Sequence, residues 1–111
     1  MMRNATVLIF TFAMMAGSQA LADTRYMFCF GGGQVGLYYS AVFPVPQGTK
    51  GADKANAFNA FVKSKYGTMI FSECHIDLSQ ASANSDKKIR EDSDQTSKFP
   101  SKLFETRWAG T

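Results

Sequence analysis

The chain has 111 residues, of which 45% are hydrophobic and 19% charged, and its formal net charge at pH 7 is +3. This length accommodates one small domain and excludes a large multidomain enzyme. We expect no nucleic-acid binding, because the basic cluster of residues 87–90 is followed directly by three acidic residues, which would repel phosphates.

Residues 1–22 have the three parts of a secretory signal peptide. Arg3 supplies a positive charge, residues 6–16 form an uncharged and mostly apolar run, and residues 20–22 read Ala-Leu-Ala, as at a cleavage site. A membrane-spanning helix needs roughly 20 apolar residues, and this run is shorter. We therefore expect a mature domain of residues 23–111 that has no membrane span and is exported to the periplasm or, alternatively, to the cell exterior. Loss of Arg3 lowers its net charge from +3 to +2.

The first predicted strand, residues 25–30, is followed by a glycine-rich stretch whose letters match G-x-G-x-x-G at residues 31–36. In a dinucleotide-binding fingerprint the last glycines open a helix whose N–H groups hold the pyrophosphate. Here residues 37–45 alternate as in a strand and run into Pro44 and Pro46, which interrupt it. The context therefore excludes the fingerprint, and no cofactor is expected. We expect these glycines to turn a β-hairpin in which they tolerate positive φ.

The clearest predicted helix covers residues 53–66. Its apolar residues recur at helical spacing and form one stripe: Phe58, Phe61, Val62 and Tyr66. Gly67 is placed to adopt the left-handed conformation that ends a helix. Because a helix in a small domain must bury one face, this stripe is interpreted as core.

The rest of the chain predicts a strand at residues 68–78, a polar segment at 79–97 and a terminal strand at 101–108. For the polar segment a surface helix and a mobile loop both remain open. If this segment is a helix, one narrow face is formed by Ala81, Ser85 and Ile89, and Ile89 is the only large apolar residue on it. The terminal strand would carry Phe104, Thr106 and Trp108 on one face. The expected fold is a single α+β domain in the order β-β-α-β-α-β, with a mainly antiparallel sheet and one or two helices on one face.

Cys29 and Cys74 are the only cysteines, and each lies in an apolar, strand-like segment. An exported chain reaches a compartment where disulfides persist, and a small domain gains from a covalent link. A metal pair or a reactive thiol would require a C-x-x-C or clustered His/Cys pattern, which the sequence lacks. The sequence therefore predicts a Cys29–Cys74 disulfide that joins two strands.

His75 is the only histidine, and in a strand it shares one face with Glu73 and Asp77. A carboxylate beside an imidazole is the pair that general-base chemistry uses, and it is also a set of metal ligands. The simpler interpretation is a solvated sheet face, which assigns neither a catalytic residue nor a metal site. The alternative is a small exported hydrolase or metal-binding enzyme that uses Glu73, His75 and Asp77.

The main functional hypothesis is a non-catalytic, exported module that binds another protein, for example as an inhibitor or an immunity-type protein of the cell envelope. The sequence is rich in aromatic residues and poor in catalytic patterns. Exposed aromatic side chains make good interface anchors because they bury much area at a low entropic cost. Tyr38, Tyr39 and Trp108 are the candidates for contact with the partner, whose identity the sequence leaves open, and packing in the core is the alternative interpretation of each.

Overall fold

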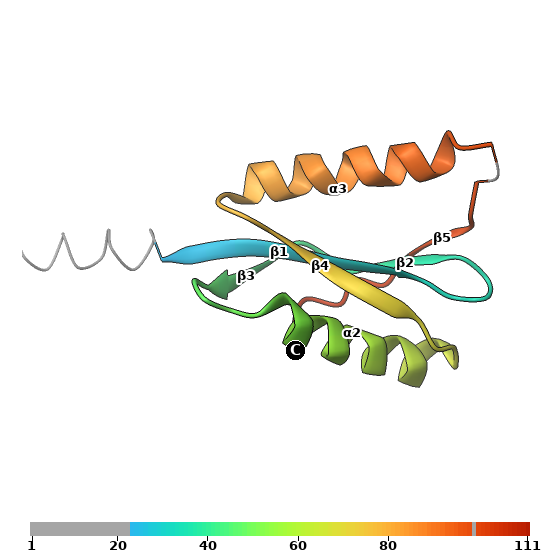
Figure 1. The fold of residues 1–111 in the computed structure, drawn as a ribbon, viewed down its shortest axis with the longest axis horizontal. Coiled ribbons are helices and arrows are strands. Elements are labelled where there is room, and N and C mark those ends of the chain that lie inside the picture. The colour runs from blue at the N-terminus through green and yellow to red at the C-terminus, as the bar shows by residue number, and fades with distance from the viewer. Residues whose placement is uncertain (1–22, 99) are drawn as a thin grey trace, which may run out of the picture.

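The computed structural model describes residues 23–98 and 100–111, in which five strands form one sheet with a helix on each face (Figure 1). The signal peptide predicted for residues 1–22 lies outside the described residues. The elements follow in the order β1 (Thr24–Gly32), β2 (Leu37–Tyr39), β3 (Phe43–Pro46), α2 (Gly51–Tyr66), β4 (Phe71–Asp77), α3 (Gln80–Gln95) and β5 (Leu103–Glu105). The predicted α+β class and the mainly antiparallel sheet are confirmed.

Strand β1 is the centre of the sheet. It pairs with β4 and, through the two halves of its length, with β2 and β3, always antiparallel, whereas β5 joins β2 in parallel. Between the pairs Phe30–Tyr39 and Met27–Phe43, two residues of β1 face three of the neighbouring strand. This extra residue is a β-bulge. It divides the single strand predicted at residues 37–45, so that the order becomes β-β-β-α-β-α-β.

Ser40 fills the bulge and is fully buried. Its Oγ accepts a hydrogen bond from the backbone N–H of Cys29 at 2.7 Å and donates one to the carbonyl oxygen of Ala41 at 2.8 Å. The hydroxyl thus satisfies backbone groups that the interrupted ladder leaves without strand partners.

Helix α2 covers one face of the sheet. Phe58 and Val62 are fully buried against Met27 and Cys29 of β1, as the apolar stripe predicted. Gly67 ends the helix in the left-handed conformation, with φ 70°, which was also expected. The main core therefore lies between α2 and the sheet.

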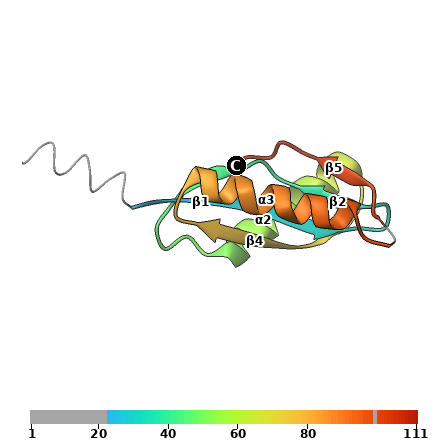
Figure 2. The ribbon, with the colours of Figure 1, turned by 90° about the horizontal axis from the view of Figure 1, so that it is seen from above.

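Helix α3 lies along the opposite face of the sheet (Figures 1 and 2). The sequence predicted one or two helices on one face, and the structure has one helix, α2, on that face and α3 on the other. The segment that remained open at 79–97 is thus mostly helical, but Ala81, Ser85 and Ile89 are all exposed. The helix is held instead by the small buried Ala83 and by polar contacts. The guanidinium of Arg90 lies 4.2 Å from the ring centre of Phe30. Lys87 Nζ donates to Glu105 Oε2 at 2.9 Å, and the Tyr39 hydroxyl donates to Asp94 Oδ2 at 2.7 Å.

The glycine-rich stretch forms the predicted hairpin between β1 and β2. The reason for its glycines differs from the expectation, because positive φ values occur at Gly48, Gly67 and Gly110 and at no glycine of the hairpin. Close backbone approach explains two of them. A Cβ on Gly31 would lie 2.5 Å from the carbonyl oxygen of Phe71, and one on Gly36 would overlap the carbonyl oxygen of Lys102.

The Cys29–Cys74 disulfide is present and links directly opposed residues of β1 and β4. At the C-terminal end, β5 is shorter than the predicted strand, and Arg107 departs from extended backbone with φ 63°. Phe104 and Trp108 nevertheless both pack into the core on the α2 side, and Thr106 is buried.

Candidate functional site

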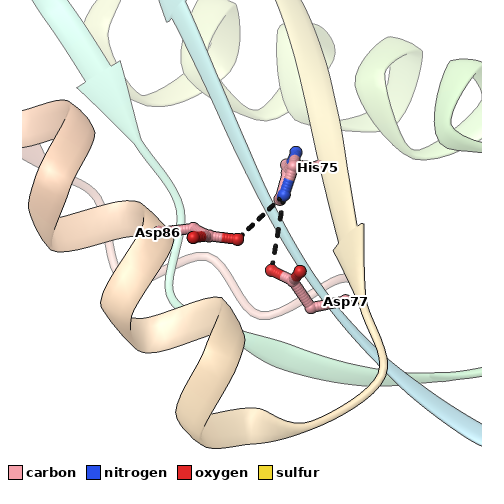
Figure 3. Close-up of side chains that lie close together, drawn as sticks. All are labelled: His75, Asp77 and Asp86. Carbon is pink, nitrogen blue, oxygen red and sulfur yellow. Dashed lines mark hydrogen bonds and ion pairs between the residues drawn. The ribbon is translucent and has the colours of Figure 1, made fainter.

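Three chemically active side chains converge between β4 and α3 (Figure 3). His75 Nε2 lies 3.1 Å from Asp86 Oδ2 and 3.4 Å from Asp77 Oδ2. One ligand atom from each residue lies within 4.8 Å of those of the other two. We refer to His75, Asp77 and Asp86 as the His75 cluster.

The local structure explains how the cluster forms. Alternation along β4 places His75 and Asp77 on the same face. Two residues then connect β4 to α3, and the side chain of Ser79 caps the helix by accepting a hydrogen bond from the backbone N–H of Ser82 at 3.1 Å. Asp86 follows the buried Ala83 by three residues and so lies on the side of α3 that faces the sheet.

Asp77 is the most buried member of the cluster, with a side chain that is 14% exposed. Its Oδ1 accepts a hydrogen bond from Ser82 Oγ at 3.4 Å, whereas its buried Oδ2 has no hydrogen-bond donor among the described residues. Burial raises the pKa of Asp77, and the carboxylate of Asp86 raises it further, while His75 acts in the opposite direction. The site therefore places two carboxyl groups beside a single imidazole.

Glu73 stands outside this cluster. It is exposed on β4, opposite Phe30 of β1. Of the three residues that the sequence grouped, the structure thus brings His75 and Asp77 together and adds Asp86 in place of Glu73. Asp86 could have been found from the sequence only if residues 79–97 had been predicted as a helix and the side of that helix that faces the sheet had been known.

An open pocket of about 370 Å³ adjoins the cluster. Its lining combines aromatic, apolar and charged side chains from the sheet and α3: Phe28, His75, Asp86, Ile89, Arg90, Ser93 and Asp94. Phe28 of β1 contributes to this lining, and the centre of its ring lies 5.6 Å from that of His75. His75 and Asp86 are therefore accessible to a small ligand or ion.

The aromatic residues expected to contact a partner are all buried: Tyr38, Tyr39 and Trp108. Tyr38 stacks on Phe104 with ring centres 4.7 Å apart, and Trp108 packs against Phe58. Burial and the hydrogen bond to Asp94 raise the pKa of Tyr39. In this conformation the three rings stabilise the fold and do not present a contact surface, so their burial favours the interpretation as core residues.

A different aromatic side chain is exposed. Phe71, the first residue of β4, is 86% exposed, and Met69 beside it is 68% exposed. Both line a shallow hollow of about 200 Å³ together with Ala60 and Lys63 of α2. We refer to Ala60, Lys63, Met69 and Phe71 as the Phe71 patch.

No protein-family model matches the chain, and neither the curated proteins nor the solved structures include one with significant similarity to it. Within residues 23–98 and 100–111, neither helix has the length and apolar character needed to cross a membrane.

Proposed function

We propose that this protein is an exported, disulfide-linked binding module that attaches to another protein of the cell envelope through the Phe71 patch and inhibits, neutralises or escorts it. The observation that carries the proposal is the exposure of Phe71. A phenylalanine that is 86% exposed leaves a large apolar surface in water, and such surfaces are typical of contact sites.

The patch has the features of an interface anchor. Phe71 lies on a strand that pairs with β1, and the disulfide at Cys74 joins the same two strands three residues further on. A ring held on rigid backbone loses little conformational entropy when it binds. Lys63 lies exposed at the rim, so the proposed partner has an apolar pocket with an acidic border.

The disulfide supports the proposed compartment. A disulfide persists in the periplasm or outside the cell and is reduced in the cytosol. The leader predicted for residues 1–22 gives the route of export. Both features support a partner that is itself exported.

The test is an affinity capture from envelope extract with the oxidised protein, followed by mass spectrometry and by measurement of the dissociation constant for the captured partner. Phe71→Ser should weaken this affinity by about 30-fold, which corresponds to the loss of a hot-spot residue of about 2 kcal/mol. Leu78→Ser is the matched control, because Leu78 directly follows the other end of β4 and is 77% exposed.

The control should bind the partner as the unmodified protein does. Equal affinity of the Phe71→Ser variant, or an equal loss in both variants, would contradict the proposed surface. Circular dichroism of each variant establishes that the fold is retained, which is expected because both side chains are exposed.

A further inference from the structure

We propose that His75, Asp77 and Asp86 bind one divalent transition-metal ion, best matched by Zn²⁺, that bridges β4 and α3. This inference is independent of the Phe71 patch, with which the cluster shares no residue.

The spacing of the ligand atoms fits such an ion. Zinc bonds to imidazole nitrogen and carboxylate oxygen are about 2.0–2.2 Å long, so two ligands of a tetrahedral site lie about 3.4 Å apart. The His75 Nε2 atom lies 3.1 Å and 3.4 Å from the nearest carboxylate oxygens of Asp86 and Asp77. An ion therefore fits between the three side chains with small rotations of the carboxylates.

The donor set and its charge indicate the class of ion. One imidazole with two carboxylates suits zinc and its neighbours in the first transition row better than Ca²⁺ or Mg²⁺, which prefer oxygen ligands alone. The Asp77 Oδ2 atom fits this assignment, because it is buried, lies 3.4 Å from His75 Nε2 and accepts no hydrogen bond among the residues described. A cation satisfies this oxygen and offsets the repulsion between the two carboxylates.

The surroundings keep the ligands in place and leave the ion accessible. His75 is adjacent to the disulfide at Cys74, and the Ser82 hydroxyl orients Asp77 through its other oxygen. The side chains of His75 and Asp86 are 47% and 41% exposed and line the open pocket. Coordination positions that the protein does not fill would therefore face this pocket and accept water or a small anionic ligand.

Binding would also fasten α3 to the sheet. Within the described chain this helix has one buried apolar residue, Ala83, and is otherwise attached by polar contacts. An ion that binds only the folded protein raises its stability in proportion to the logarithm of the ion concentration. We therefore expect the transition temperature of the oxidised protein to rise with added Zn²⁺.

The primary experiment titrates ZnCl₂ into chelator-treated, oxidised protein and follows binding by calorimetry and by NMR of the imidazole. Because the chain has a single histidine, every imidazole signal belongs to His75. The proposal predicts saturation at one equivalent and a shift of the imidazole signals that is complete at the same point. Absence of saturable binding, or saturation without a change in the imidazole signals, would overturn it.

The variants separate the ligands from their neighbours. Asp86→Asn and His75→Gln should each weaken Zn²⁺ binding by more than about tenfold, since loss of even a supporting outer contact costs about 10–100-fold. Glu73→Gln is the matched control, because Glu73 lies on the same face of β4 outside the cluster, and its affinity should equal that of the unmodified protein. An equal loss in the control and in Asp86→Asn would show general attraction by acidic residues and would contradict the assigned site. The NMR titration of the unmodified protein decides the question if a variant fails to fold.

The two proposals fail separately. The Phe71→Ser variant should bind Zn²⁺ with the affinity of the unmodified protein. The Asp86→Asn variant should bind the captured partner with the affinity of the unmodified protein.

Discussion

Gly36 lies where the end of the β1–β2 hairpin meets the segment that leads into β5. The backbone N–H of the next residue, Leu37, donates to the carbonyl oxygen of Lys102 at 2.7 Å, and this hydrogen bond draws the two chains together. A Cβ at Gly36 would overlap the same carbonyl oxygen. The glycine is thus required by close approach, and only its hydrogen atom fits.

We expect Gly36→Ala to lower the free energy of unfolding by about 1–3 kcal/mol, because the added methyl group forces the backbones apart. Gly32→Ala is the control from the same motif, since its Cβ would meet nothing nearer than the Leu37 side chain at 3.7 Å. Urea denaturation should show a change below about 0.5 kcal/mol for the control. Similar losses in both variants would mean that general stiffening of the hairpin, and not the contact with Lys102, sets the cost.

At the scale of elements, α2 and α3 differ in how far the sequence predicts them. The apolar stripe of α2 specifies both its existence and its buried face, because burial of Phe58 and Val62 needs no knowledge of the partner strands. The inner face of α3 is polar, and its partners include Phe30 and Glu105 from distant parts of the chain. Periodicity carries no information about such contacts.

The same difference explains what the sequence could reveal of the candidate site. His75 and Asp77 are neighbours on one strand, so their proximity follows from strand alternation alone. Asp86 joins them through the orientation of α3, which only the three-dimensional contacts determine. The β-bulge at Ser40 is a further case, because a pattern of alternating residues does not show where an extra residue is inserted.

The contact between α3 and β5 predicts a dependence of stability on pH. Burial and the hydrogen bond with Glu105 raise the pKa of Glu91 to about 7, while Lys87 opposes the shift. The folded protein therefore holds a proton on Glu91 that the unfolded chain, with an ordinary value of 4.5, releases at lower pH. The contribution of Glu91 to the free energy of unfolding is therefore fully present below pH 4.5 and is lost as the pH rises towards about 7.

We expect Glu91→Gln to flatten the decline in the free energy of unfolding between about pH 5 and about pH 8, because the amide does not ionise. Urea denaturation at the two pH values measures the difference. Glu73→Gln, which changes an exposed carboxyl group on β4 that does not contribute to the Glu91 shift, should keep the original slope. An unchanged slope in Glu91→Gln would contradict the role of this carboxyl group.

At the scale of the whole molecule, the disulfide joins the central strand β1 to β4. Helix α2 lies between these two strands in the sequence, and α3 directly follows β4. Cys29 and Cys74 are 45 residues apart in the sequence, and the closed loop contains β2, β3 and α2. In the chain-entropy account a link of this span stabilises the folded state by about 4 kcal/mol. This is a large share of the roughly 5–15 kcal/mol that separates folded from unfolded proteins.

We therefore expect the double variant Cys29→Ala/Cys74→Ala to lose about 4 kcal/mol in urea denaturation, and the unmodified protein to lose a similar amount when a reductant is present. The variant removes the thiols as well as the link, so agreement between the two measurements assigns the loss to the disulfide itself. A loss below about 1 kcal/mol in both would mean that the β1–β4 pairing and the α2 core suffice without it. The fold would then be nearly as stable in a reducing compartment as outside the cytosol, and the disulfide would give no support to export.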